Sequence, residues 1–167
     1  MKAALAVLLL ALSVSAAGQT ADAIYKQACG PLGAKFDVEQ VPGKPPAALE
    51  PGKALVYFIQ EENFGHFTTR VGLDGVWVGV VEHASYTFVS VAPGEHHACA
   101  ATLNRKRPEV EFLSFTAEAG KTYYYLVRGT LGGGESYLNI MEFGAVDRDE
   151  ARYLIATDPQ SVAKPAP

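Results

Sequence analysis

Four histidines are the residues of this chain whose type could together hold a metal ion: His66, His83, His96 and His97. Imidazole nitrogens are common ligands of zinc and related metals. His96 and His97 are adjacent, so a regular strand would direct them to opposite faces and at most one could join a shared site. The sequence has no H-E-x-x-H motif and no paired C-x-x-C motif. It therefore predicts surface or turn histidines and no metal site.

The segment Gly120-Lys121-Thr122 matches the last three residues of a phosphate-binding loop. That loop needs another glycine five residues before Gly120, where this sequence has Phe115. It also needs a helix after the threonine, because the N–H groups of the first helical turn bind the phosphate. The run 123–127 is rich in tyrosine and favours a strand instead. The sequence therefore predicts no nucleotide site.

Four serines are candidate nucleophiles for acyl transfer: Ser85, Ser90, Ser114 and Ser136. None lies in a G-x-S-x-G elbow, the local motif that exposes a serine at a strand-to-helix turn. A fold can still assemble a triad from distant residues, so a hydrolase with a non-standard triad is an alternative. Without a motif, the sequence predicts no catalytic residue, no cofactor and no enzymatic activity.

Aromatic side chains are a further feature with binding chemistry, and the set comprises Trp77, Tyr86, Phe88, Tyr123, Tyr124 and Tyr125. Such rings could line a platform for a carbohydrate or an apolar ligand. Alternate residues of a strand face opposite sides, however, so the tyrosine triplet must place some of its rings in a core. The pattern favours core packing, with a small-ligand or metal-binding protein as the alternative function.

The first 18 residues are typical of a secretory signal peptide. Lys2 precedes the almost entirely apolar run 3–14, and small residues follow at 15–18. The run is shorter than the roughly 20 apolar residues that a membrane span requires. We expect cleavage after Ala17 or Gly18, a periplasmic or secreted protein, and no membrane span in the mature chain.

Two cysteines, Cys29 and Cys99, remain after this cleavage. In an oxidising compartment an isolated pair most simply forms one disulfide bond, and a reactive thiol or a metal ligand is the alternative. A bridge across this separation would stabilise the fold by about 4 kcal/mol in the chain-entropy model. We predict that Cys29 and Cys99 form a structural disulfide.

The net charge of the chain limits the kinds of molecule that it is expected to bind. The chain has 14 basic and 18 acidic residues, and removal of Lys2 leaves 13 against 18, a net charge of −5. Nucleic acids and anionic lipids bind basic patches. The basic cluster 105–107 is followed by Pro108 and is expected in a solvated turn. We therefore expect no nucleic-acid partner and instead expect an envelope protein or a small ligand.

Most of the elements that position these residues are predicted strands. Apolar or alternating segments separated by turn residues predict them at 54–59, 69–73, 76–81, 86–91, 97–102, 110–117, 122–128 and 137–143. Segment 54–59 is continuously apolar, which indicates burial on both faces. Asp74-Gly75 is a hairpin signal because both residues can adopt positive φ. The pattern predicts an all-β fold, an antiparallel β-sandwich of about seven to eight strands.

Shorter elements flank these strands. A helix is expected at 21–28, followed by an alternating strand at 35–41 and a proline-rich connector at 42–51. Asp147 and Glu150 form a capping pattern for a short C-terminal helix. We divide the chain into a signal peptide (1–18), an N-terminal segment with connector (19–52), the sandwich domain (53–157) and a disordered tail (158–167).

Several segments together resemble the bacterial family called domain of unknown function 2846. They are Ala28-Cys29-Gly30-Pro31, Lys35-Phe36-Asp37-Val38, residues 52–57, residues 91–96 and the run 117–125, which is the most specific. The similarity covers roughly residues 28 to 156. It implies an exported bacterial protein of sandwich type with no assigned activity, and it supplies no catalytic or binding residue. We expect a non-catalytic binding or assembly module of the bacterial envelope.

Overall fold

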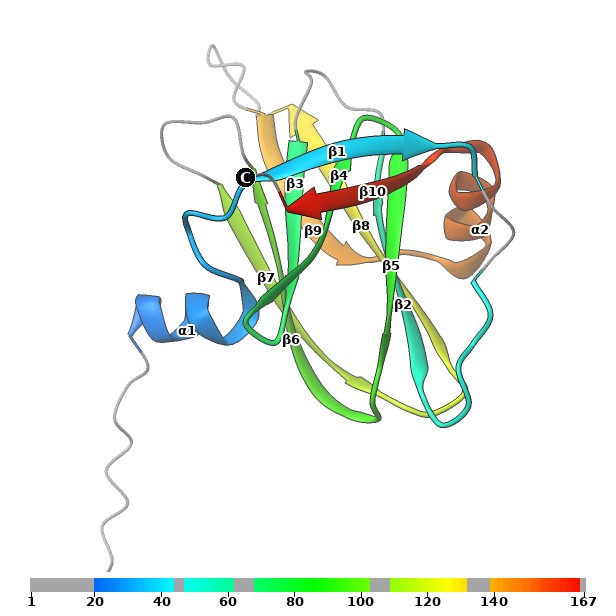
Figure 1. The fold of residues 1–167 in the computed structure, drawn as a ribbon, viewed down its shortest axis with the longest axis horizontal. Helices are drawn as coiled ribbons and strands as arrows, with labels where there is room; N and C mark the ends of the chain where they lie inside the picture. Colours follow the sequence, from blue (N-terminus) through cyan, green and yellow to red (C-terminus); the bar gives the residue numbers. More distant parts are fainter. Residues whose placement is uncertain (1–19, 44–46, 62–67, 103–108, 132–138, 166–167) are drawn as a thin grey trace, which may run out of the picture.

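The computed structural model describes residues 20–43, 47–61, 68–102, 109–131 and 139–165. These residues form two helices and ten strands (Figure 1). The elements are α1 (Ala21–Ala28), β1 (Phe36–Val41), β2 (Ala54–Gln60), β3 (Thr68–Leu73), β4 (Val76–Glu82), β5 (Ser85–Val91), β6 (Gly94–Thr102), β7 (Val110–Ala117), β8 (Thr122–Leu131), β9 (Asn139–Ala145), α2 (Arg148–Thr157) and β10 (Gln160–Pro165).

The strands form a six-stranded sheet of order β1-β10-β5-β2-β8-β9 and a four-stranded sheet of order β4-β3-β6-β7. The four-stranded sheet is antiparallel, whereas β2 runs parallel to β8 and β10 parallel to β5 in the six-stranded sheet. The β-rich class is confirmed, but a purely antiparallel arrangement of about seven to eight strands is wrong. The chain passes through the other sheet before it returns beside β2, and such a crossover permits parallel pairing.

Successive side chains of β2 point alternately into two apolar clusters on opposite faces of the six-stranded sheet. Ala54, Val56 and Phe58 face the main apolar cluster, which also contains Val71 of the four-stranded sheet. The opposite face of β2 joins a second cluster beneath α2, where Ile155 is buried. All seven residues of β2 are buried, so the prediction of a strand with two buried faces is confirmed.

The predicted turn between β3 and β4 and the predicted start of α2 are confirmed. Asp74 and Gly75 have φ angles of 50° and 80°, as the predicted hairpin between β3 and β4 requires. The Asp147 carboxylate accepts hydrogen bonds from the backbone N–H groups of Asp149 and Glu150 and so caps α2. Neither described helix is long and apolar enough to cross a membrane.

The C-terminal segment differs from the prediction. The sequence predicts disorder over 158–167, but β10 pairs antiparallel with β1 along its whole length. The Ser161 hydroxyl is buried and lies 2.9 Å from the Ser85 hydroxyl of β5. The tail has few bulky apolar residues, and its order comes from backbone pairing with β1, a segment far away in sequence. Because β1 and β10 belong to the same sheet, that sheet extends beyond 53–157 at both ends.

Candidate functional site

The predicted disulfide is confirmed and joins the end of α1 to β6. The Cα atoms of Cys29 and Cys99 lie 5.6 Å apart, and both residues are buried. Gly72 of β3 lies against the bridge, and a Cβ atom at Gly72 would lie 2.9 Å from the Cys99 sulfur. This close approach requires glycine, so the N-terminal segment packs directly on the outer face of the four-stranded sheet.

Arg70 and Trp77 hold the same N-terminal segment, a role that no local sequence motif indicates. The Arg70 guanidinium donates hydrogen bonds to the carbonyl oxygens of Leu32 and Ala34 at 3.3 Å, and it stacks 4.4 Å from the Trp77 ring. The Trp77 indole N–H donates to the carbonyl oxygen of Pro31 at 2.8 Å. Burial lowers the pKa of Arg70. These contacts fix the segment's backbone and give Arg70 a structural role.

The histidines do not gather at one place in the part of the chain that is described. His83 lies in the turn between β4 and β5 with a φ of 50°, and His66 lies outside the described residues. His96 is buried against the Phe115 ring, whereas its neighbour His97 lines a hollow beside α1. Within the described ranges, no three His, Cys, Asp or Glu side chains could hold one metal ion.

His96 forms a polar contact that joins two turns. Its Nδ1 lies 2.6 Å from a carboxylate oxygen of Asp74, and its Nε2 lies 2.8 Å from the carbonyl oxygen of Ala92. Both partners are acceptors, so this geometry is satisfied when both ring nitrogens carry a proton. Burial opposes the charge, but the hydrogen bonds with Asp74 and Ala92 outweigh it and raise the pKa of His96.

This contact predicts a pH-dependent stability. Below about pH 6.5, the ordinary histidine pKa, His96 is protonated in the folded and the unfolded protein, and the contact contributes fully. As pH rises through the higher pKa of the folded state, that contribution is lost. We therefore expect the free energy of unfolding, measured with urea, to fall from about pH 6 to 9. His96→Gln should flatten this slope and His97→Gln should keep it; equal slopes for the wild type and His96→Gln would contradict the assignment.

Among the described residues, no hydrogen bond joins Ser85, Ser90 or Ser114 to His96 or Asp74. Because His96 Nε2 already lies against the Ala92 carbonyl oxygen, the nitrogen that would activate a serine is occupied. Ser85 is buried near Ser161, and Ser114 is exposed on β7. Ser136 lies outside the described residues.

The Gly120-Lys121-Thr122 segment is a tight turn followed by a strand. Gly120 has a φ of 82°, and its N–H donates to the carbonyl oxygen of Lys53 at 2.9 Å. The Lys121 ammonium lies 2.8 Å from a carboxylate oxygen of Glu118. Thr122 begins β8, so no helix N-terminus follows that could bind a phosphate group.

The six aromatic residues pack in apolar clusters rather than on one common surface. Tyr123 and Tyr125 face the main cluster, and Tyr124 faces the opposite side of the sheet, where it stacks on Tyr57 with ring centroids 5.6 Å apart. Tyr86 and Phe88 join the cluster beneath α2, and Trp77 belongs to the cluster around the disulfide. The expectation that the triplet alternates between faces is confirmed.

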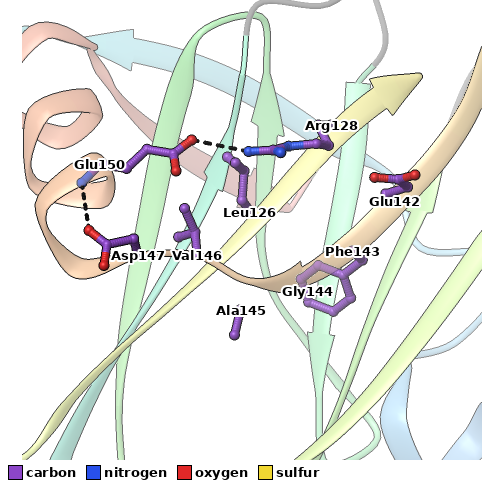
Figure 2. A pocket seen from close by; sticks show the side chains of 9 residues that line it. All are labelled: Leu126, Arg128, Glu142, Phe143, Gly144, Ala145, Val146, Asp147 and Glu150. Atoms are coloured by element: carbon purple, nitrogen blue, oxygen red, sulfur yellow. Dashed lines mark hydrogen bonds and ion pairs between the residues drawn. The ribbon is translucent and has the colours of Figure 1, made fainter. Parts of the chain in front are cut away.

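Among the described residues, one concave surface lies where β8, β9 and α2 meet, and we call it the β8–β9 hollow (Figure 2). It has a volume of about 370 Å³ and is lined by Leu126, Arg128, Glu142, Phe143, Gly144, Ala145, Val146, Asp147 and Glu150. Leu126 and Gly144 are directly paired across the two strands. A Cβ atom at Gly144 would meet nothing within 4 Å, so the missing side chain leaves space in the hollow.

The charges around the β8–β9 hollow are unbalanced. Its lining contains one basic residue, Arg128, and three acidic residues, Glu142, Asp147 and Glu150, which gives a net charge of −2. The Arg128 guanidinium already forms an ion pair with Glu150 at 3.1 Å (Figure 2). It also lies 3.6 Å from a carboxylate oxygen of Glu61. Within the described chain, Glu142 has no basic side chain at ion-pair distance. The hollow therefore presents carboxylate oxygens to solvent.

In the sequence, Asp147 and Glu150 are recognisable only as helix-capping residues, and no motif points to Arg128, Glu142 or Gly144. The cross-strand pairs Arg128–Glu142 and Leu126–Gly144 depend on the β8–β9 register, which no local motif specifies. No family model matches the chain, and no curated protein and no solved structure matches it either.

Proposed function

We propose that this chain is an exported, non-catalytic β-sandwich module of the bacterial envelope, and that its β8–β9 hollow receives a basic group of a partner protein. The signal-like residues 1–18 and the Cys29–Cys99 disulfide support export. The resemblance of residues 28–156 to domain of unknown function 2846 supports the same location. The shared cluster between the two sheets supports the sandwich.

The observation that carries the binding proposal is the charge of the β8–β9 hollow. Glu142 of β9 and Glu150 of α2 both line this hollow, and the adjoining Arg128 is ion-paired with Glu150 and Glu61. A lysine or arginine side chain would place its charge beside the carboxylates and its methylene groups over Leu126. The occupied Nε2 of His96 supports a role without catalysis.

The proposal is tested by nuclear magnetic resonance titration of the isotope-labelled mature protein with capped Gly-Lys-Gly, Gly-Arg-Gly and Gly-Glu-Gly peptides. The protein is recovered from a periplasmic extract, where its mass reports whether the leader has been removed. We expect the basic peptides to shift the backbone amides of residues 142–147 with a dissociation constant on the order of 1 mM. Added salt should weaken this binding, because the charges are partly exposed.

Gly144→Leu provides a variant that fills the hollow and leaves its charges unchanged. The backbone at Gly144 has space for a side chain, so the fold should be retained and the peptide-induced shifts should disappear. Gly144→Ala is the matched control and should reduce binding less. Equal shifts with the acidic peptide, or shifts that persist in Gly144→Leu, would contradict the proposal. Binding of an uncharged small molecule at the same residues would favour the small-ligand alternative.

A further inference from the structure

Arg128 lies between two acidic residues that belong to the strands on either side of β8. In the six-stranded sheet, β8 is flanked by β2 and by β9. Glu142 of β9 is directly opposite Arg128, and both side chains line the β8–β9 hollow. Glu61 follows the end of β2, where its backbone N–H donates a hydrogen bond to the carbonyl oxygen of Val127 at 3.1 Å. One guanidinium therefore has a carboxylate on each flank.

Of these two flanking carboxylates, the Arg128 guanidinium pairs with the one outside the hollow. Its Nε lies 3.6 Å from a carboxylate oxygen of Glu61, and its Nη2 donates to Glu150 of α2 at 3.1 Å. Figure 2 shows the guanidinium directed toward Glu150 and away from Glu142. Oppositely charged residues that face each other on antiparallel strands lie close enough to interact. Glu142 is therefore within reach of Arg128, yet the two form no ion pair in the described part of the chain.

The ion pairs of Arg128 can exchange because they are partly exposed. The side chains of Arg128, Glu61 and Glu150 are 39%, 42% and 46% exposed. Surface ion pairs contribute little individually, so a guanidinium can move from one carboxylate to another at small cost. Its position then depends on how many carboxylates attract it from each side. Glu61 and Glu150 together outnumber Glu142, which explains the direction seen in the structure.

We propose that Glu61 is a positioning residue for the β8–β9 hollow, because it holds Arg128 away from Glu142. While Arg128 is paired with Glu61 and Glu150, the Glu142 carboxylate is open to a basic group of the partner. When Arg128 moves to Glu142, its own cation neutralises that carboxylate and takes the place of the partner's basic group. Arg128 is thus an internal competitor of the partner.

Glu61 acts on binding from outside the hollow, since it is not one of the lining residues. It sets the fraction of molecules in which Glu142 is open, and the apparent affinity for a partner falls in proportion to that fraction. The effect on binding rests on the proposed function of the hollow. The position of Arg128 does not, because it can be measured in the protein alone.

Nuclear magnetic resonance of the peptide-free mature protein tests the position of Arg128. Glu61→Gln removes one of the carboxylates that hold Arg128, so the nuclear Overhauser effect between the Arg128 δ-methylene and Glu142 γ-methylene protons should grow at least about twofold. Asp149→Asn is the matched control, because it removes one charge from a side chain of α2 that is 76% exposed and does not line the hollow. It should keep the wild-type pattern. An unchanged Arg128–Glu142 contact in Glu61→Gln would overturn the inference.

Titration with capped Gly-Lys-Gly measures the consequence for binding. Glu61→Gln should weaken binding by about threefold, because the internal competitor is held less firmly. Arg128→Gln should strengthen binding by about threefold, because the competitor is absent. Both substitutions also change the charge near the hollow, and combining them separates the two causes. Without Arg128, Glu61 has no side chain to position, so adding Glu61→Gln should change the affinity by less than about 1.5-fold.

Two other results have distinct meanings. An equal loss of affinity on Glu61→Gln with and without Arg128 would show a general effect of charge and would overturn the inference. A wild-type protein that binds no basic peptide would contradict the proposed function instead, because the Arg128–Glu142 contact is measured without peptide.

Discussion

Replacing Tyr125 with alanine should lower the free energy of unfolding by about 3 to 5 kcal/mol, the range for removing a large aromatic side chain from a core. Tyr125 is only 6% exposed and belongs to the main cluster between the sheets. Its ring centroid lies 5.0 Å from that of Phe115 and 6.2 Å from that of Phe58. Burial raises the pKa of Tyr125 to about 12, which agrees with a ring that water hardly reaches.

Urea unfolding at neutral pH measures this loss, and Lys121→Ala provides the control. Lys121 lies on the same turn-and-strand segment, but its side chain is 58% exposed and its ion pair with Glu118 is a surface pair. The Lys121→Ala midpoint should match that of the wild type. Tyr125→Phe should lower the free energy of unfolding much less than Tyr125→Ala, because it keeps the aromatic ring and its contacts. Similar losses for Lys121→Ala and Tyr125→Ala would contradict this account of the segment.

Removing the disulfide with Cys29→Ala and Cys99→Ala together should also have a large effect, a loss of about 4 kcal/mol in the free energy of unfolding. The two cysteines are separated by 70 positions, so the bridge strongly restricts the unfolded chain. In the folded protein it also anchors the end of α1 on the four-stranded sheet, beside Gly72.

The double variant and the reduced wild type should unfold at the same urea concentration, because both lack the same cross-link. The oxidised wild type should unfold at a clearly higher concentration. Trypsin provides a second readout, since Lys26 and Lys35 flank the anchored segment and should be cleaved faster without the bridge. A double variant that unfolds at the same urea concentration as the oxidised wild type would show that the contacts of Arg70 and Trp77 hold this segment unaided.

The sequence by itself determined the elements and their local signals. Alternation of apolar and polar residues with a period of two predicted strands, and the continuous apolar run 54–59 indicated a strand buried on both faces. Asp74-Gly75 specified the hairpin turn, and Asp147 specified the start of α2. The disulfide between Cys29 and Cys99 followed from the number of cysteines and the expected compartment. Each of these features depends on neighbouring residues or on a count, so a single sequence contains it.

Only the tertiary structure decided which distant segments meet. β10 is ordered by pairing with β1 more than a hundred residues earlier, and β2 pairs in parallel with β8 after the chain has passed through the other sheet. The contact of His96 with Asp74 and the pairing of Leu126 with Gly144 depend on turn geometry and strand register. Register and strand order arise from long-range packing of whole strands, and many orders satisfy the same local pattern. For this reason the β8–β9 hollow is visible only in the folded chain.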